Sequence, residues 1–359
     1  MDHLAGTYDN DTMKLYINGI FIRSAACKGP FIFKDKNPLF IGGNSNNKNH
    51  SAVDCFKGSI DEVRIYKRAL DENEIKSLLN QLNMKLKVVL IGAGGKMGMR
   101  LTHNLRNSKY DVYYIEVSQM GIEKLKEKGI TVSEAESVIN QADAVIYAVP
   151  DVALGKVTET YIPKMKKGAL AVTLDPAAAL AGKLFARTDI AYFITHPTHP
   201  SIFNWEPVEE NMKDHFGGVT AKQSIVCSLM RGKSEDYLKG EELACTFYAP
   251  VLRSHNITVE QMGLLEPALV ETLASTCIYV IREGLEEVIK RGIPAEAARD
   301  FLLGHLRIQL AVLFNELPGA VFSDAANKAL QRGLKEFIRE DWKKVFEPDN
   351  VKDQIASIT

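Results

Sequence analysis

The stretch Lys87-Val88-Val89-Leu90-Ile91-Gly92-Ala93-Gly94-Gly95-Lys96-Met97-Gly98 decides the fold of the larger part of the chain. Its first five residues form a continuous, mainly apolar run, typical of a buried parallel strand. The glycines that follow allow a tight turn and a close approach of the backbone to a ligand, and a helix is expected from Gly98 to about Arg106. This order of strand, turn and helix predicts a helix N-terminus that holds the phosphates of a dinucleotide.

The glycine turn departs from the standard spacing of such sites. It is G-x-x-G-x-x-G, or G-x-G-x-x-x-G when Gly94 is counted, in place of G-x-G-x-x-G. A turn between strand and helix that binds nothing is therefore the alternative, which the strand–turn–helix context disfavours. The residues expected to contact the dinucleotide are Gly92, Gly94, Gly95, Lys96, Met97, Gly98, Glu116, Val149 and Pro150.

The second expected strand, Asp111–Glu116, ends on a carboxylate. Glu116 lies 24 residues after Gly92, where an acid usually hydrogen-bonds the ribose hydroxyls. A carboxylate there repels a 2′-phosphate, so the sequence favours NAD over NADP. Ser118 and Gln119 leave room for a phosphate, and a solvated charge at a strand end is the alternative interpretation of Glu116.

Three further apolar strands alternate with helical segments. They are expected within Ala142–Pro150, Ala169–Pro176 and Ile190–Ile194. The alternation predicts a right-handed parallel sheet, in which ligands lie beyond the carboxyl ends of the strands. Val149-Pro150 and His196–Pro200 both fall at that edge.

Two histidines, His196 and His199, follow the last of these strands. Oxidation of an alcohol needs a base for the hydroxyl proton while a hydride leaves for the nicotinamide, and a neutral imidazole is available near pH 7. One of the two rings is therefore the expected base; the alternative is a proline-rich loop whose backbone satisfies both rings. The other expected site residues are Glu271 and His305 as catalytic groups and Lys222, Arg253, His255 and Glu266 as substrate contacts.

A metal site is a second interpretation of the same groups. The two loop histidines could meet Glu271 and His305 around a divalent metal, because a carbon shift next to a carbonyl benefits from a Lewis acid. Loop-borne His-x-x-His spacing is a weak metal pattern, so the ligands stay unassigned. Glu266 and Glu271 are five residues apart, about 140° around an α-helix, and are not expected to share a face. A salt-bridged helix charge and a packed core histidine are the structural alternatives for Glu271 and His305.

Helical periodicity dominates from about Leu264 onward. The sequence predicts helices over Glu266–Arg291, Glu296–Leu317 and Asp324–Val345, separated by glycine and proline breaks. An all-α region therefore follows the sheet region.

The first 83 residues have a different texture, with short alternating runs and many turn residues. Asn18-Gly19 is a strong hairpin signal, and Pro38–Gly43 and Gly58–Tyr66 are further expected strands. Asp71, with Glu74 three residues later, forms a capping box that predicts a short helix. The pattern is that of an antiparallel β-sandwich.

Composition excludes several classes of protein. The 359 residues, 46% apolar and 25% charged, suit a folded chain of two or three domains. A formal net charge of −1 provides no basic field for nucleic acid. No apolar run approaches the roughly 18–20 residues of a membrane span, and no signal peptide begins the chain. Five scattered cysteines without Cys-x-x-Cys favour a reducing, cytoplasmic location.

The N-terminal segment resembles the C-terminal half of the laminin-G-like, concanavalin-type jelly roll. The resemblance rests on His3–Asp9, Leu15–Gly19, Ile41–Gly43, Gly58–Tyr66 and Arg68–Leu70. It implies carbohydrate binding, although half a sandwich assembles no complete ligand site. The alternative is a segment joined upstream of an enzyme that begins at Met84.

Residues 84–348 resemble the family with a phosphogluconate-dehydrogenase-like C-terminal domain, which includes D-apionate oxidoisomerase. The resemblance rests on Thr195–Pro200, Arg253–His255, Leu265–Thr272, Arg299–His305 and Asp341–Phe346. It implies NAD-linked oxidation of a sugar acid, coupled to rearrangement, and a homodimer through the long helices. Phosphogluconate decarboxylation itself is disfavoured. The decarboxylating 6-phosphogluconate dehydrogenases place a lysine base on the long helix, and the expected helix Glu266–Arg291 has no lysine before Lys290.

The expected organisation is a partial β-sandwich (jelly-roll) segment over residues 1–83, an α/β Rossmann domain over 84–262 and an all-α substrate and dimerisation domain over 263–359. The expected function is NAD-dependent oxidation of a sugar acid, with NADP less favoured, a divalent metal left open, and neither nucleic acid nor membrane as partner. The alternatives are another 6-phosphogluconate or 3-hydroxyacid dehydrogenase-like enzyme, and a carbohydrate-binding module fused to an inactive Rossmann protein.

Overall fold

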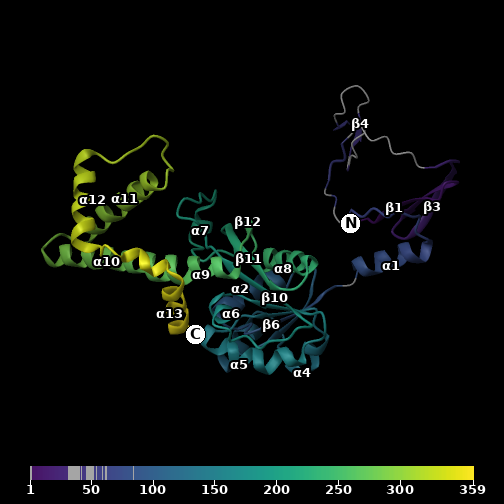
Figure 1. Cartoon of the computed structure of the whole chain (residues 1–359), viewed down its shortest axis with the longest axis horizontal. Helices are drawn as coiled ribbons and strands as arrows, with labels where there is room; N and C mark the ends of the chain where they lie inside the picture. The colour runs from purple at the N-terminus through teal and green to yellow at the C-terminus, as the bar shows by residue number, and fades with distance from the viewer. Residues whose placement is uncertain are drawn as a thin grey trace. The chain divides into compact units, whose positions relative to one another are not determined.

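The chain forms two compact units, Met1–Lys85 and Leu86–Thr359, drawn in Figure 1. The computed structural model describes residues 2–30, 41, 43–45, 52–53, 55–58, 60, 63–83 and 85–359. Most of the expected strand Pro38–Gly43 lies outside these described residues. Each unit is described by itself below.

A three-stranded antiparallel sheet in the order β1-β2-β3 is the base of the smaller unit. The predicted hairpin is confirmed: Asn18 and Gly19 have φ of 51° and 73°, as a type I′ turn requires. The predicted capping box is confirmed too, with reciprocal bonds between Asp71 and Glu74. The elements are β1 (Leu4–Tyr8), β2 (Thr12–Ile17), β3 (Ile20–Ala26), β4 (Asn44–Ser45), β5 (Ala52–Val53) and α1 (Glu72–Asn83).

The sheet of the smaller unit exposes apolar side chains. All seven residues of β3 are exposed, including Ile20, Phe21 and Ile22. A sheet with such a face is consistent with part of a sandwich. The expected strand Gly58–Tyr66 is wrong for its described residues, which form no strand. Ile65 there is exposed, so the alternation has no packed face to bury its apolar side chains.

A seven-stranded sheet in the order β12-β11-β10-β9-β8-β6-β7 is the centre of the larger unit (Figure 1). Strands β6 to β10 run parallel, as predicted. The last two strands were not predicted from the sequence: β11 runs antiparallel to β10, and β12 runs parallel to β11. Antiparallel neighbours need no long crossover, and the β10–β11 connection contains only the four-residue helix α7 among its described elements. The strands are β6 (Lys87–Ile91), β7 (Asp111–Ile115), β8 (Ala144–Tyr147), β9 (Leu170–Thr173), β10 (Ala191–Pro197), β11 (Gln223–Arg231) and β12 (Val251–Asn256).

Helices cover both faces of this sheet. Successive residues of β6 point to opposite faces, so Leu90 joins one core cluster and Val89 the other. The first cluster includes Leu101 of α2 and Phe247 of α8, and the second includes Leu154 of α5. The shorter helical elements are α2 (Lys96–Leu105), α3 (Gln119–Glu127), α4 (Ala135–Val138), η1 (Ile139–Gln141), α5 (Asp151–Tyr161), η2 (Ile162–Lys164), α6 (Ala177–Leu180), α7 (Glu209–Met212) and α8 (Ser234–Phe247). Helix α2 thus begins two residues before the expected Gly98.

One continuous helical run crosses from the sheet into the C-terminal region. It consists of α9 (Val259–Gly263), the π-helix η3 (Leu264–Ala274) and α10 (Ser275–Lys290). The run therefore begins before the expected Glu266, and Pro267 lies inside its π-helical part. The remaining elements are α11 (Ala295–Leu313), α12 (Asp324–Phe337), η4 (Trp342–Phe346) and α13 (Pro348–Ile358).

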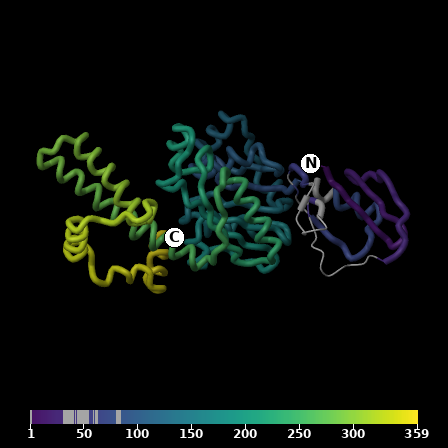
Figure 2. The backbone as a smooth tube through the Cα atoms, turned by 90° about the horizontal axis from the view of Figure 1, so that it is seen from above, coloured from purple at the N-terminus to yellow at the C-terminus, as the bar shows by residue number. Residues whose placement is uncertain are grey.

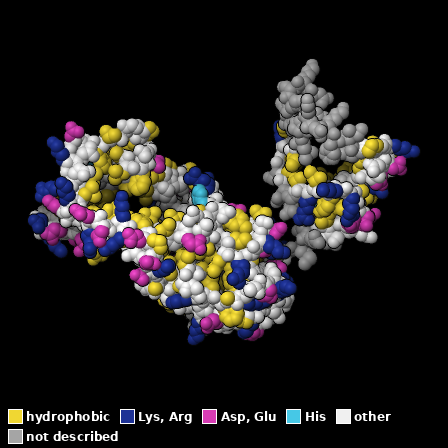
Figure 3. Space-filling model, viewed as in Figure 1, with side chains coloured by type: hydrophobic (Ala, Val, Ile, Leu, Met, Phe, Trp, Pro, Cys, Tyr) yellow, Lys and Arg dark blue, Asp and Glu magenta, His cyan; other side chains and the backbone are white. Residues whose placement is uncertain are grey.

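Helices α10, α11 and α12, which we call the arm, extend from the sheet (Figures 1 and 2). Helix α10 has no buried residue, and Ile278, Tyr279 and Val280 are 65%, 58% and 56% exposed. Apolar side chains are spread over the arm (Figure 3). Contrary to the expectation from sequence, the run Val259–Lys290 is long and apolar enough to cross a bilayer by length and composition alone. Helix α13 returns to the sheet region, where Val351 and Ile355 pack on Ala177 of α6.

Candidate active site

The glycine turn follows β6, and its backbone is packed too tightly for side chains at three positions. A Cβ on Gly94 would lie 2.4 Å from Gly121 Cα. A Cβ on Gly92, which has φ of +79°, would lie 2.4 Å from the Ala148 carbonyl oxygen. A Cβ on Gly98 would lie 1.9 Å from the Gly92 carbonyl oxygen. Gly92 and Gly98 are therefore required by the strand–helix packing, as the close-packing role of the motif demands.

Gly95 has a different environment. A Cβ there would meet the Gly92 carbonyl oxygen at 3.3 Å and otherwise only Ala148 at 3.9 Å. Gly95 is the N-cap of α2, and no side chain caps the helix. The first N–H groups of α2, which begin at Lys96 and Met97, are thus available to an anion, and the helix dipole favours negative charge there.

Glu116 is held beside this turn at the end of β7. Its carboxylate accepts the backbone N–H of Gly94 at 2.8 Å and those of Val117 and Ser118 at 2.9 Å. Burial opposes ionisation of Glu116, but the Ser118 and Gly94 backbone bonds outweigh it and lower the pKa of the carboxyl group. The group is therefore an anion at the strand end where the sequence places the ribose contact. Val149, two residues after β8, adjoins the same turn at Gly92, and Pro150 follows it in the chain.

A second group of polar residues meets where β9, β10 and η3 come together. His196 Nε2 lies 3.8 Å from Asp175 Oδ2 and 3.7 Å from Glu266 Oε1. His196 Nδ1 lies 2.8 Å from the Pro197 carbonyl oxygen, which can only accept, so Nδ1 carries the proton. The lone pair of Nε2 in the neutral ring therefore faces the two carboxylates. All three ligand atoms lie within 4.8 Å of one another, close enough to surround one metal ion.

The π-helix changes the relation between the two glutamates. Its hydrogen bonds join residues five apart, so Glu266 and Glu271 lie on nearly the same side. The expectation that they diverge by 140° is wrong, because it assumed α-helical geometry. Burial and then the nearby Glu266 and Asp175 raise the pKa of Glu271.

Asp151, which begins α5 just after Pro150, belongs to the same acidic cluster. Burial, then Asp175 and Glu271, raise the pKa of Asp151 to about 6. In the described part of the chain, neither Asp151 nor Glu271 forms an ion pair, and the ion pairs of Asp175 and Glu266 are with His196 alone. Four carboxylates without lysine or arginine partners form a site that favours a cation.

The two histidines differ in setting. His196 lies within β10, so the expectation that both occupy a loop is wrong for this residue, because β10 extends to Pro197 to pair with β11. His199 lies in the following loop with φ of 58°, and its Nδ1 is 2.8 Å from the Phe216 carbonyl oxygen. The two ring centroids are 6.3 Å apart. The structure thus brings the two rings together. In each ring Nδ1 contacts a backbone carbonyl, which leaves Nε2 for another partner.

Three of the expected substrate contacts, Lys222, Arg253 and His255, lie on or beside the strands next to β10. His196, Val226 and His255 are register partners on β10, β11 and β12, which puts His255 about 10 Å from His196 on the same face. Arg253 shares that face, two residues nearer the crevice, and Lys222 immediately precedes β11. No hydrogen bond or ion pair occupies the side chains of these three residues within the described chain.

His305 is placed elsewhere. It lies on α11 of the arm, where its ring stacks on Phe301 at 4.1 Å and its Nδ1 is 2.7 Å from the Phe301 carbonyl oxygen. Among the described residues of one chain, His305 is not one of the side chains close enough to share a metal ion with His196. The group of described residues at metal-ligand distances is Asp175, His196 and Glu266.

Asp175 and Asp151 were missed as site residues. Both follow the carboxyl ends of parallel strands, in Leu174-Asp175-Pro176 and Val149-Pro150-Asp151, and that position is itself a usable signal. Phe216, whose carbonyl oxygen contacts His199, carries no comparable sequence signal, because that contact depends on the fold of the long loop between β10 and β11.

Comparison with known families supports this architecture. Residues 204–359 match the C-terminal domain of decarboxylating phosphogluconate dehydrogenase, and residues 82–198 match the NADPH-binding domain of acetohydroxy acid isomeroreductase. Residues 2–76 match the concanavalin A-like lectin/glucanase superfamily. The two resemblances seen in the sequence are thereby confirmed.

Two curated relatives are matched over nearly all of their own length. The chain is 49% identical to the D-apionate oxidoisomerase of Cupriavidus necator, over 77% of this chain and 100% of the relative. It is 39% identical to the D-apionate oxidoisomerase of Blautia hydrogenotrophica, over 76% of this chain and 96% of the relative. A crystal structure of an NAD-binding semialdehyde dehydrogenase from Cupriavidus necator, in complex with calcium and NAD, superposes with a TM-score of 0.75 at 49% identity and covers 77% of this chain and 100% of that one.

Proposed function

The chain belongs to the family of the D-apionate oxidoisomerases, and from this premise we propose that it oxidises D-apionate or a closely related branched sugar acid with NAD and rearranges the product. The observation that carries the proposal is the pair of sites on one sheet edge. An anion-binding helix N-terminus follows β6, and a His–carboxylate cluster follows β9 and β10. Dehydrogenation of an alcohol needs both within reach of one substrate.

The first site fits a dinucleotide. The uncapped N-terminus of α2 and the open side of Gly95 provide N–H groups and room for a diphosphate. The anionic Glu116 provides an acceptor for a ribose diol and repels a 2′-phosphate, which favours NAD over NADP. NAD supplies the hydride acceptor when bound; the protein's part is to hold it at the strand ends.

The second site fits a divalent cation. Asp175, His196 and Glu266 offer two oxygens and an unprotonated imidazole nitrogen, separated by 3.7–3.8 Å from Nε2. These separations are too long for hydrogen bonds but suit ligands that share an ion at about 2.0–2.4 Å. A cation there supplies a Lewis acid for the carbonyl formed by oxidation. It also offsets the charge of four clustered carboxylates, which would otherwise repel an acid substrate.

With His196 as a ligand, His199 is the base of the proposal. Its Nδ1 donates to Phe216, so Nε2 can take the hydroxyl proton as the hydride leaves. The side chains of Arg253, His255 and Lys222, on or beside β11 and β12, have no hydrogen-bond or ion-pair partner within the described chain. They are therefore suited to bind the substrate carboxylate. Glu271 belongs to the acidic cluster, and because its pKa is raised it can exchange a proton during the rearrangement.

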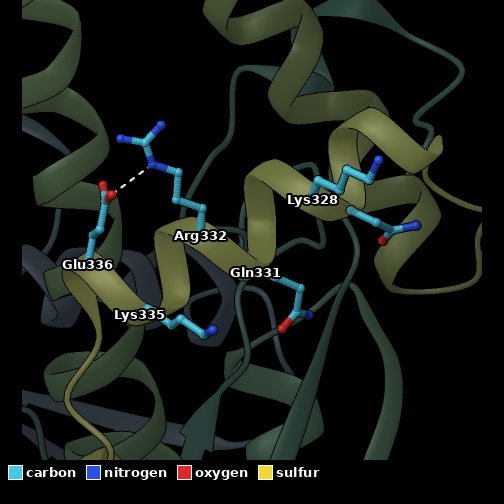
Figure 4. A pocket seen from close by; sticks show the side chains of 6 residues that line it. Lys328, Gln331, Arg332, Lys335 and Glu336 are labelled. Carbon is cyan, nitrogen blue, oxygen red and sulfur yellow. Dashed lines mark hydrogen bonds and ion pairs between the residues drawn. The ribbon is translucent and has the colours of Figure 1, made fainter.

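The proposal includes a homodimer formed through the arm. Helix α10 buries none of its residues within the chain, although an apolar helix of this kind is stable in water only when covered. A cavity of about 530 Å³ beside α12 is lined by side chains of that helix alone: Asn327, Lys328, Gln331, Arg332, Lys335 and Glu336 (Figure 4). A second arm is the surface of matching length and apolarity. It would cover α10. A cytoplasmic location belongs to the same proposal, since the five cysteines are free.

The test is turnover. The full chain, saturated with Mn²⁺ or Mg²⁺, is mixed with NAD and D-apionate, and absorbance at 340 nm is followed while the product is identified by carbon NMR. We expect NADH formation and a product with a rearranged skeleton. A panel containing 6-phosphogluconate and 3-hydroxy acids distinguishes the second candidate, a simple hydroxyacid dehydrogenase. Turnover of these acids, with none of apionate, would overturn the proposal.

A further inference from the structure

The loop between β10 and β11 is fastened to the helix that begins at the dinucleotide site. Arg100 of α2 forms an ion pair with Asp214 at 3.2 Å and donates to the Gly217 carbonyl oxygen at 2.6 Å. The other oxygen of Asp214 accepts the backbone N–H groups of Val219, Thr220 and Ala221. Asn104 of α2 also donates to the Gly218 carbonyl oxygen, at 2.8 Å. The loop, which we call the strap, is therefore anchored on α2 at two residues.

Phe216 occupies the centre of this strap and contacts both halves of the site. Lys96 Nζ lies 4.0 Å from the centroid of its ring, and Arg100 Cζ lies 4.9 Å from it. On its other side the ring meets that of His199 edge to face, with centroids 5.7 Å apart. The Phe216 carbonyl oxygen accepts the Nδ1 proton of His199.

We propose that Phe216 is a positioning residue that sets His199 relative to the dinucleotide-binding helix. The proposal rests on the proposed function, in which His199 is the base. His199 has a left-handed backbone conformation, which a non-glycine residue adopts at a cost and only when its surroundings hold it there. That support comes from the backbone carbonyl of residue 216, which accepts from His199 Nδ1, and from the Phe216 ring, which meets the imidazole edge to face. Its other contacts are with two cations on the helix that holds the cofactor.

The same contacts place Lys96 at the cofactor. Lys96 is the first residue of α2, and the Phe216 ring holds its ammonium group through a cation–π contact. A lysine so restrained loses less freedom when it pairs with a phosphate. Phe216 thus acts on two steps, strongly on proton transfer through His199 and weakly on dinucleotide binding through Lys96.

The experiment compares Phe216→Leu, Phe216→Tyr and the control Phe203→Leu, an apolar change in the same loop. With D-apionate and NAD we expect kcat of Phe216→Leu to fall about tenfold or more, since misplacement of about 1 Å costs such factors. Its Kd for NAD, measured by calorimetry, should rise about threefold. All three variants keep the backbone carbonyl of residue 216, so Phe216→Leu tests the ring alone. Phe216→Tyr keeps the ring and should retain at least half of the kcat and of the NAD affinity, as should Phe203→Leu.

A readout without turnover separates this proposal from the proposed function. Diethyl pyrocarbonate acylates neutral imidazoles, and peptide mass spectrometry gives the rate at His199 with His255 as internal reference. We expect Phe216→Leu to raise the His199 rate at least threefold while the His255 rate stays constant, even if no substrate is found. Unchanged acylation and NAD affinity in Phe216→Leu would overturn the proposal. So would equal losses in the leucine and tyrosine variants together with a lower melting temperature, which would show a purely structural role.

Discussion

The nucleotide-binding region and the arm are both rich in apolar residues, but only the first buries them within one chain. All four residues of β8 and of β9 are buried, whereas α10 buries none of its sixteen. The central strands of the sheet are covered by the unit's own helices on both faces, as the two core clusters show. The arm has apolar side chains on surfaces that no described part of the chain covers.

This difference separates two kinds of site. The glycine turn and Glu116 are complete inside one chain, so their geometry follows from local packing. The acidic cluster lies where the sheet region passes into the helical run through η3, and it lacks cationic partners. We infer that the first site works as soon as the chain folds. We propose that the second also needs an ion and the covering of the arm to reach its working form.

Two glycine variants give the largest expected effect and test the completeness of the first region. Gly98→Val drives a side chain into the Gly92 carbonyl and should prevent folding of the larger unit. Gly95→Val has local room and should fold, yet block the diphosphate and weaken NAD binding at least a hundredfold. Calorimetry with NAD and thermal melting measure both. Native NAD affinity in a folded Gly95→Val would remove this turn from the cofactor site.

Acidic substitutions on α10 test whether the arm is covered by a second copy. Ile278→Glu combined with Ile281→Glu would bury charge in the proposed interface and should weaken dimerisation at least a hundredfold. Leu238→Glu, an equally exposed apolar-to-acid change on α8, is the control and should remain dimeric. Sedimentation velocity gives the masses. A wild-type chain that stays monomeric at micromolar concentration contradicts this view of the arm.

Metal removal tests the incompleteness of the second region. Dialysis against EDTA should reduce turnover at least tenfold, and Mn²⁺ or Mg²⁺ should restore it. Affinity for NAD should change little, because the cofactor turn is independent of the cluster. His196→Gln should lose the response to added metal. Full activity after complete chelation, verified by elemental analysis, would exclude the cation from the mechanism.

The pKa of Asp151, raised to about 6, predicts a smaller effect on stability. The unfolded carboxyl group has a pKa near 4, so between about pH 4 and 6 the folded protein holds this proton more tightly and stability falls as pH rises. Asp151→Asn removes a penalised charge at pH 7.5 but little at pH 5. With chelator present, and allowing for solvent screening, it should raise the melting temperature by about 2 °C at pH 7.5 only. An equal shift at both pH values would assign the effect to packing.

Removal of the smaller unit should have the least effect on catalysis. A chain that begins at Met84 retains the larger unit and the whole length that the oxidoisomerase relatives match. Its kcat and its KM for the sugar acid should equal those of the full chain. A glycan-binding assay on both proteins tests whether the smaller unit binds carbohydrate. A large loss of turnover on truncation would show that the units cooperate.

The sequence predicted what local chemistry determines. The strand at Lys87–Ile91, the glycine turn and the Asn18-Gly19 hairpin follow from period and turn preferences over a few residues. The proximity of His196 to the other strand ends followed from the rule for parallel sheets. These features depend little on the rest of the fold.

The rest depends on tertiary context. The π-helix that aligns Glu266 with Glu271 has no local pattern that separates it from an α-helix, and it overturned an argument based on 3.6 residues per turn. The reversal of β11 follows from the course of a long loop. Helical periodicity located the arm but could not tell which surface covers it, because the same apolar pattern suits a core, a membrane or a second chain.

A crystal structure of the full chain with NAD and Mn²⁺ tests the central claim most directly. The account predicts the diphosphate on the N–H groups of Lys96 and Met97, with the metal between Asp175, His196 and Glu266. It also predicts the nicotinamide within about 5 Å of the site where the substrate alcohol meets His199. A dinucleotide bound elsewhere, or a nicotinamide that points away from the histidines with the metal on other residues, would contradict it.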